Sequence, residues 1–423
     1  MSTELRPREA LGLIGAWLSL VRSRRTRPYL AMTLCLDAAF GFTFLVALQS
    51  YLPEQYGGGA GLAGFALACY GGTKLLTQTA GGHFIDRVGL RAGFIAGFAA
   101  VIGAQGIFLA APIWLPLAAV AAATYGVGAA ILWPAITALA RAEFAEGERA
   151  KLTSALTLSS AGGLALALAL GTLLPAGLHY AVAVTITLLF VAGAAQSARG
   201  MAPAMAFGES RLSIAPASLI RPLISGRFLF LAIVLLMENA AGSGLMAIYR
   251  PFGRDVLGLS LREEVLLLAP AACCLPPALV AGGALSDRLG REPMLLLGLS
   301  CAGMAVCGLA ASDGLAVAAV LAVVAAVGLG LAVPSLTAAA LDLAPAQAPA
   351  SVLAWFLTFE SLGHAAGPAA AGFVASAASV HVAVAVLGCL FLGAVPSGLA
   401  AMAAAAFIAR ARRAPALVPE QPS

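Results

Sequence analysis

The sequence predicts an all-α membrane protein with twelve transmembrane helices arranged as two six-helix bundles. Of its 423 residues, 61% are hydrophobic and only 10% are charged, whereas soluble globular domains are about 25% charged. The apolar residues fall in continuous runs of roughly 20, the length that crosses a hydrocarbon core about 30 Å thick. A membrane β-barrel would instead show shorter segments of alternating polarity. A third observation, an internal repeat, divides the chain into two similar halves.

The apolar runs define six spans in each half. Residues 29–197 form the expected N-terminal bundle, with spans at 29 to 50, 60 to 82, 92 to 111, 115 to 140, 152 to 174 and 178 to 197. Residues 227–409 form the expected C-terminal bundle, with spans at 227 to 250, 264 to 285, 293 to 312, 315 to 342, 351 to 375 and 379 to 409.

The remaining segments are predicted to lie outside the bilayer. Residues 1–28 form an N-terminal segment whose apolar run 11–21, with Trp17, is expected to be an interfacial helix. Residues 198–226 form a linker, and residues 410–423 form a tail. Most of the 24 lysines and arginines fall in these segments and in the alternate loops that lie on the same side of the membrane. By the positive-inside rule, both termini and the linker are cytoplasmic.

The repeat is clearest in a charged turn. The chain reads Gly-Gly-His-Phe-Ile-Asp-Arg-Val-Gly at 81–89 and Gly-Gly-Ala-Leu-Ser-Asp-Arg-Leu-Gly at 282–290, an interval of 201 residues. At the same interval Asp37 of the first span lies over Glu238 of the seventh. Two acids inside the membrane are therefore expected to be related by pseudo-symmetry.

Six spans plus six, joined by a cytoplasmic linker and carrying this turn twice, resemble the major facilitator superfamily. The resemblance covers residues 29–409. In the first copy of its turn motif Leu90 replaces a basic residue and Arg91 restores one. The resemblance implies a cytoplasmic gate latch between the halves, and the alternative is that the arginines only fix topology. The residues assigned to this gate motif are Gly82, Asp86, Arg87, Gly89, Arg91, Gly283, Asp287, Arg288, Gly290 and Arg291.

Four ionisable residues lie near the middle of their spans: Asp37, Lys74, Glu238 and Glu360. A charge at the bilayer centre costs at least about 2.5 to 3.5 kcal/mol, so each marks a candidate functional site. The resemblance implies that Asp37 and Glu238 face the central pathway, and that Lys74 pairs with Glu360, with Asp37, or alternately with both. The alternative is a static buried pair that fixes how the helices pack.

Several further residues are assigned to the pathway. Gln78 lies one turn beyond Lys74, His364 one turn beyond Glu360, and Asn239 beside Glu238. His364 is expected either to relay protons or to pack against neighbouring helices. Aromatic residues such as Phe40, Phe44 and Tyr70 either face an amphipathic ligand or pack against other helices. Two prolines, Pro134 and Pro334, are expected to kink cavity-lining helices.

These features predict a secondary active transporter driven by protons, or by Na⁺. The four intramembrane charges sum to −2 when ionised, which favours a cationic or amphipathic small molecule over an anion. The pattern resembles the drug/proton antiporter branch and indicates export. That branch carries a motif of glycines and a proline in its fifth span, and the proline is missing here between Ser159 and Gly171. The alternative is proton-coupled uptake of a neutral solute such as a sugar or nucleoside, but Asn239 is the one asparagine.

Other classes of function lack sequence support. The chain has no glycine-rich phosphate loop or nucleophile constellation, and its seven cysteines lack metal-ligand spacing. We therefore expect no enzymatic activity, cofactor or metal. The net charge of +5 reflects topology rather than binding to nucleic acid. The expected protein is a multi-pass monomer in the cell membrane, the inner membrane of a bacterium.

Overall fold

The computed structural model describes residues 22–57, 60–143, 146–174, 179–201, 225–343 and 349–411. The expected interfacial helix, most of the linker and the tail lie outside these residues. Within them every regular element is helical. The fold is therefore all-α, as the sequence predicts.

The N-terminal half begins with one long span built from three consecutive segments. These are α2 (Arg27–Gly41), the π-helix η1 (Phe42–Tyr51) and the short α3 (Leu52–Tyr56). The following helices are α4 (Ala60–Val88), α5 (Leu90–Ala110), α6 (Leu117–Glu143), α7 (Glu146–Leu173) and α8 (Tyr180–Arg199).

The C-terminal half repeats this order. It begins with α11 (Gly226–Pro251), which continues into a second π-helix, η2 (Phe252–Val256). The following helices are α12 (Leu261–Leu289), α13 (Arg291–Ala310), α14 (Leu315–Asp342), α15 (Pro349–Ala377) and α16 (Val380–Ala411).

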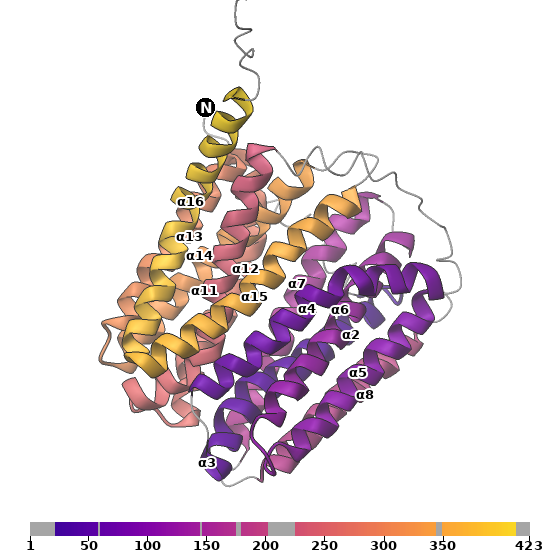
Figure 1. The fold of residues 1–423 in the computed structure, drawn as a ribbon, viewed down its shortest axis with the longest axis vertical. Coiled ribbons are helices and arrows are strands. Elements are labelled where there is room, and N and C mark those ends of the chain that lie inside the picture. The colour runs from indigo at the N-terminus through magenta and orange to yellow at the C-terminus, as the bar shows by residue number, and fades with distance from the viewer. Residues whose placement is uncertain are drawn as a thin grey trace, which may run out of the picture.

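Equivalent helices have equivalent neighbours in the two halves. Helix α2 packs on α7 and α8 as α11 packs on α15 and α16, and α4 packs on α6 as α12 packs on α14. The halves lie side by side (Figure 1) and meet mainly where α4 crosses α15, and to a smaller extent where α7 crosses α12. We call the face where α2 begins the terminal face, and the opposite face, where α3 and η2 end, the distal face.

Nine helices in the described parts of the chain are long and apolar enough to cross a membrane, fewer than the twelve expected spans. The expected spans that fall short coincide with α4 and α15, and with α7, whose apolar stretch is only Ala155–Gly171. These helices contact the opposite half. Polar residues of α4 and α15, including Lys74 and Glu360, lie where these helices pack against protein, whereas other positions on the three helices, such as Leu76, Leu173 and Phe373, are apolar and exposed.

Glycines allow α15 to fit closely between α4 and α11. A Cβ at Gly64 of α4 would lie 2.5 Å from the Pro368 carbonyl oxygen, and one at Gly71 would clash with the backbone of His364 and Ala365. A Cβ at Gly367 of α15 would clash with the Ala240 carbonyl on α11. Any side chain at these positions would push the helices apart, so Gly64 and Gly71 fix the distance between the halves, and Gly367 fixes how closely α15 packs on α11 within the C-terminal half.

The repeated turns use their glycines in two ways. Gly89 and Gly290 have φ of 89° and 98°, a conformation that side chains disfavour, and each ends one helix and starts the next. The close approaches occur at Gly81, facing the Ala130 carbonyl, and at Gly282, facing Gly330. The adjacent motif glycine Gly82 has more room, with no atom of the described residues within 4 Å of an added Cβ.

Candidate functional site

The four intramembrane charged residues come from four different helices and meet where the two halves join. Lys74 on α4 forms an ion pair with Glu360 on α15, with 3.0 Å between Nζ and Oε1. The Lys74 side chain is 8% exposed and that of Glu360 is 25% exposed. Of the two partners considered for Lys74, this structure pairs it with Glu360. The pair therefore ties the N-terminal half to the C-terminal half near mid-depth.

Asp37 on α2 is half-buried and lies against α7. Its Cβ lies 3.1 Å from the position that a Cβ would take on Gly163, and the Ser160 hydroxyl hydrogen-bonds its carboxylate. Its second oxygen, Oδ2, is buried and has no hydrogen-bond partner among the described residues. Lys74 is near enough for its charge to act on Asp37, but the two do not form an ion pair. A buried oxygen without a donor is costly, so this carboxylate is suited to take up a proton or a cationic group.

Glu238 on α11 is half-buried and is held by its sequence neighbour. The Asn239 amide donates to Glu238 Oε2 at 2.6 Å and to the Leu235 carbonyl at 3.0 Å. The negative charge of Glu360 on α15 also acts on Glu238. Since Lys74 is already paired with Glu360, Glu238 forms no ion pair with a cation within the described residues.

The polar residues beside the ion pair extend it along α4 and α15. His364 Nδ1 lies 3.0 Å from the Glu360 carbonyl oxygen and 4.0 Å from its carboxylate. Ser361, which the sequence analysis missed, donates to Gln78 Oε1 at 2.6 Å and is fully buried. The sequence feature that could have identified Ser361 is its position next to Glu360, which pairs with Lys74, one turn from Gln78. The two halves are thus joined by two successive polar contacts.

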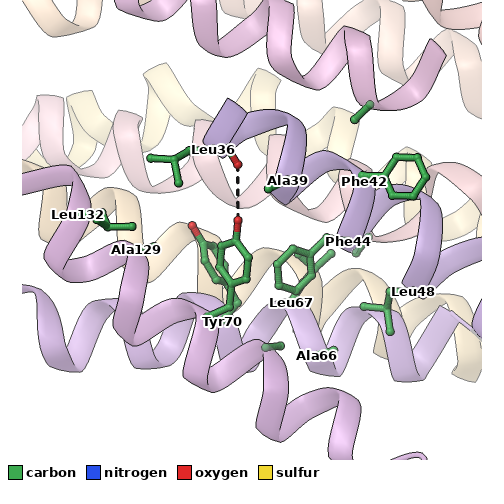
Figure 2. Close-up of a cluster of buried hydrophobic side chains, with 14 of the residues drawn as sticks. Leu36, Ala39, Phe42, Phe44, Leu48, Ala66, Leu67, Tyr70, Ala129 and Leu132 are labelled. Atoms are coloured by element: carbon green, nitrogen blue, oxygen red, sulfur yellow. Dashed lines mark hydrogen bonds between the residues drawn. The ribbon is translucent and has the colours of Figure 1, made fainter. Parts of the chain in front are cut away.

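Aromatic side chains form one wall beside Asp37. The rings of Phe40 and Tyr70 have centroids 5.2 Å apart, and those of Phe44 and Tyr125 are 5.4 Å apart. Figure 2 shows Tyr70 and Phe44 next to each other and a tyrosine hydroxyl bonded to Leu36 O; this is Tyr125, at 3.5 Å. The charge of Asp37 acts on both tyrosines. A carboxylate next to aromatic faces is a favourable setting for an organic cation.

The repeated turns lie at the terminal face. Arg291 donates to Asp342 Oδ2 at 3.3 Å and to Ser286 Oγ at 3.1 Å, both in its own half. Arg87, Arg91 and Arg288 are exposed. The side chains of His83, Asp86 and Asp287 lie outside the described residues, so a latch between halves stays a prediction. Pro134 and Pro334 lie inside the unbroken helices α6 and α14, and their kinks also stay a prediction.

The distal face holds contacts that the sequence analysis missed. Gln49 in η1 donates to the Met246 carbonyl at 2.6 Å, and Tyr249 on α11 donates to the Leu45 carbonyl at 2.8 Å. Arg250 forms a fully buried ion pair with Glu264 at the start of α12. The expected span 227 to 250 ends at Arg250, and nothing in a hydropathy pattern identifies its buried partner.

Comparison with known proteins decides the family. The profile described as Major Facilitator Superfamily matches residues 30–368 and 277–422. The chain belongs to the Major Facilitator Superfamily. As a member of this superfamily it is a multi-pass transporter that acts on small molecules by alternating access, not an enzyme.

A solved structure shares the fold of this superfamily member. It is the crystal structure of a bacterial homologue of the human lysosomal transporter Spinster, in an inward-facing and unoccupied conformation. The match has a TM-score of 0.65 and 16% identity, and covers 92% of this chain and 96% of the other. The comparison with curated proteins finds no match.

Proposed function

We propose that this transporter exports a small amphipathic or cationic molecule in exchange for protons, with Asp37 and Glu238 as the proton-binding groups. The observation that carries the proposal is the division of the four central charges. Lys74 and Glu360 neutralise each other at 3.0 Å. Asp37 and Glu238 are left without an ion pair in the described residues, on symmetry-related helices.

Two uncompensated carboxylates in a membrane interior favour binding of positive charge. Each is costly to bury in its ionised form, and either a proton or a cationic substrate removes that cost. Because the two ligands compete for the same groups, binding one promotes release of the other. This competition is the basis of exchange, since one carboxylate cannot hold a proton and a cation strongly at once.

The surroundings support an organic rather than an inorganic cation. Phe40 and Tyr70 lie beside Asp37 and provide ring faces, and a cation over such a face is stabilised by about 0.5–2 kcal/mol. The same rings provide apolar surface to an amphipathic molecule. A sugar or nucleoside would instead need several amides and hydroxyls, and the chain has a single asparagine, Asn239, already bonded to Glu238.

The test uses everted membrane vesicles loaded with a pH-sensitive dye. A panel of lipophilic cations is added to vesicles that contain the wild type, Asp37→Asn or Glu238→Gln. We expect cations to collapse the pH gradient in wild-type vesicles only, because each substitution removes a proton-binding group. Asp313→Asn, which changes an exposed carboxylate in the turn between α13 and α14, is the matched control and is expected to behave as wild type.

Two results would contradict the proposal. Collapse of the gradient in both pathway variants would show that neither carboxylate carries protons. A wild type that is silent to every cation but responds to neutral sugars or nucleosides would replace export of cations by coupled uptake of a neutral solute.

A further inference from the structure

Two hydrogen bonds connect the halves near the distal face, and they are reciprocal. Gln49 in η1 donates its side-chain amide to the Met246 carbonyl on α11, at 2.6 Å. Tyr249 on α11 donates its hydroxyl to the Leu45 carbonyl in η1, at 2.8 Å. Each helix thus sends one side chain to the backbone of the other. We call these four residues the distal clasp.

The clasp follows the internal repeat. Its two acceptors, Leu45 and Met246, lie 201 residues apart, the same interval that relates Asp37 to Glu238. Each acceptor lies eight residues beyond its acid toward the distal face. On α11 eight residues correspond to about 12 Å along the helix. The clasp therefore lies across the pseudo-symmetry axis, directly distal to the two carboxylates.

The chemistry of the clasp allows it to open and close. Both acceptors are backbone carbonyls inside helices, and a carbonyl has a second lone pair beyond its helical hydrogen bond. Separation of the helices therefore leaves neither carbonyl unsatisfied. Gln49 keeps a second bond, to the Phe44 carbonyl at 3.0 Å within η1. When the helices part, the Tyr249 hydroxyl and one N–H of the Gln49 amide exchange their carbonyl partners for water.

The backbone that carries half of the clasp is unusual. Gln49 and Leu45 lie in η1, a π-helix of ten residues that follows directly on the α-helix carrying Asp37. Such helices are rare and are found mostly at functional sites. All ten residues of η1 are buried, so the clasp closes over a tightly packed segment.

We propose that the distal clasp is the gate of the distal face, which keeps that face closed in this structure and separates when the transporter alternates. The proposal relies on alternating access, the property of the superfamily, and not on protons as the coupling ion. It assigns Gln49 and Tyr249 as positioning residues that set the balance between conformations without touching the substrate.

The test measures how far apart the halves lie at the distal face. Spin labels are placed on Ile113→Cys and Asp313→Cys, two exposed turn positions in opposite halves, with the seven native cysteines replaced. Electron–electron double resonance then reports their distance distribution without any substrate. We expect Tyr249→Phe and Gln49→Met each to raise the population ratio of the longer-distance conformer to the shorter by about 3- to 10-fold, the typical effect of losing one hydrogen bond.

The matched control is Tyr56→Phe. It removes a hydroxyl whose partner, His179 Nε2 at 3.1 Å, lies in the same half and near the same face. It is expected to leave the distance distribution unchanged. Equal distributions for wild type, Tyr249→Phe and Gln49→Met would overturn the proposal, as would an equal shift in Tyr56→Phe. Neither outcome depends on proton transport. Failure of the gate proposal can therefore be distinguished from failure of the proposal that Asp37 and Glu238 bind protons.

Discussion

At the scale of single residues, we propose that the chemistry depends on the Lys74–Glu360 ion pair and on two acids, Asp37 and Glu238, that form no ion pair within the described residues. Lys74 is one of only two lysines beside 22 arginines. An ammonium is compact and gives up its proton more readily than a guanidinium, so lysine suits a site whose partners change. In this structure its partner is Glu360, and Asp37 is close enough for the Lys74 charge to act on it.

The ion pair gives a prediction that separates a static from a functional role. Lys74→Met leaves Glu360 buried without its partner and is expected to lower the free energy of unfolding by about 3 kcal/mol, the lower end for a broken buried pair, since Glu360 is 25% exposed. The double variant Lys74→Met/Glu360→Gln restores neutrality and is expected to regain most of that stability. Thermal unfolding of the purified variants measures both effects.

Transport by the double variant then decides the role of the pair. We expect the double variant to fold but not to transport. It lacks Lys74, the cationic partner that Asp37 could take when it releases its proton. A double variant that transports at the wild-type rate would show that the pair only fixes helix packing.

At the scale of helices, the contact between α4 and α15 is the main contact between the two halves, and its character changes along its length. Close glycine approaches at Gly64 and Gly71 lie toward the distal face, and the Lys74–Glu360 and Gln78–Ser361 contacts follow along the same helices. One turn further toward the terminal face, Gly82 has open space around it. If the terminal face closes during transport, this space is where α4 and its new neighbour must approach.

Gly82→Leu is therefore expected to fold normally and to lose transport. A Cβ at Gly82 meets no described atom within 4 Å, and replacing a helical glycine adds helix propensity of about 0.5–1 kcal/mol. The same side chain would obstruct closure of the terminal face. Gly103→Leu on α5, which also meets no atom within 4 Å and lies on an exposed helix face, is the matched control. Loss of transport in both variants, or in neither, would contradict this role of Gly82.

How much the sequence could predict depended on whether a contact is local. The helices, the repeat and the turns at Gly89 and Gly290 follow from hydropathy and from the glycine conformation, which act within short segments. The partner of Lys74 depends on which helices the fold brings together. The distal clasp could not be predicted because its acceptors are backbone carbonyls, which every residue has. Ser361 and Glu264 were missed for a similar reason, since their partners come from other helices.

At the scale of the whole molecule, the duplicated halves place two acids in equivalent positions and allow the pathway to open to either face. In this structure two hydrogen bonds of the distal clasp join the halves at the distal face.

We propose that Asp37 and Glu238 link substrate movement to the proton gradient. The most direct measurement is accumulation of a fluorescent quaternary ammonium dye by purified protein in proteoliposomes, with and without an imposed pH gradient. We predict that the wild type concentrates the dye only when the gradient is present. Asp37→Asn and Glu238→Gln should exchange dye across the membrane but not concentrate it. Equal accumulation by the wild type with and without the gradient, or gradient-driven accumulation by both variants, would contradict the claim.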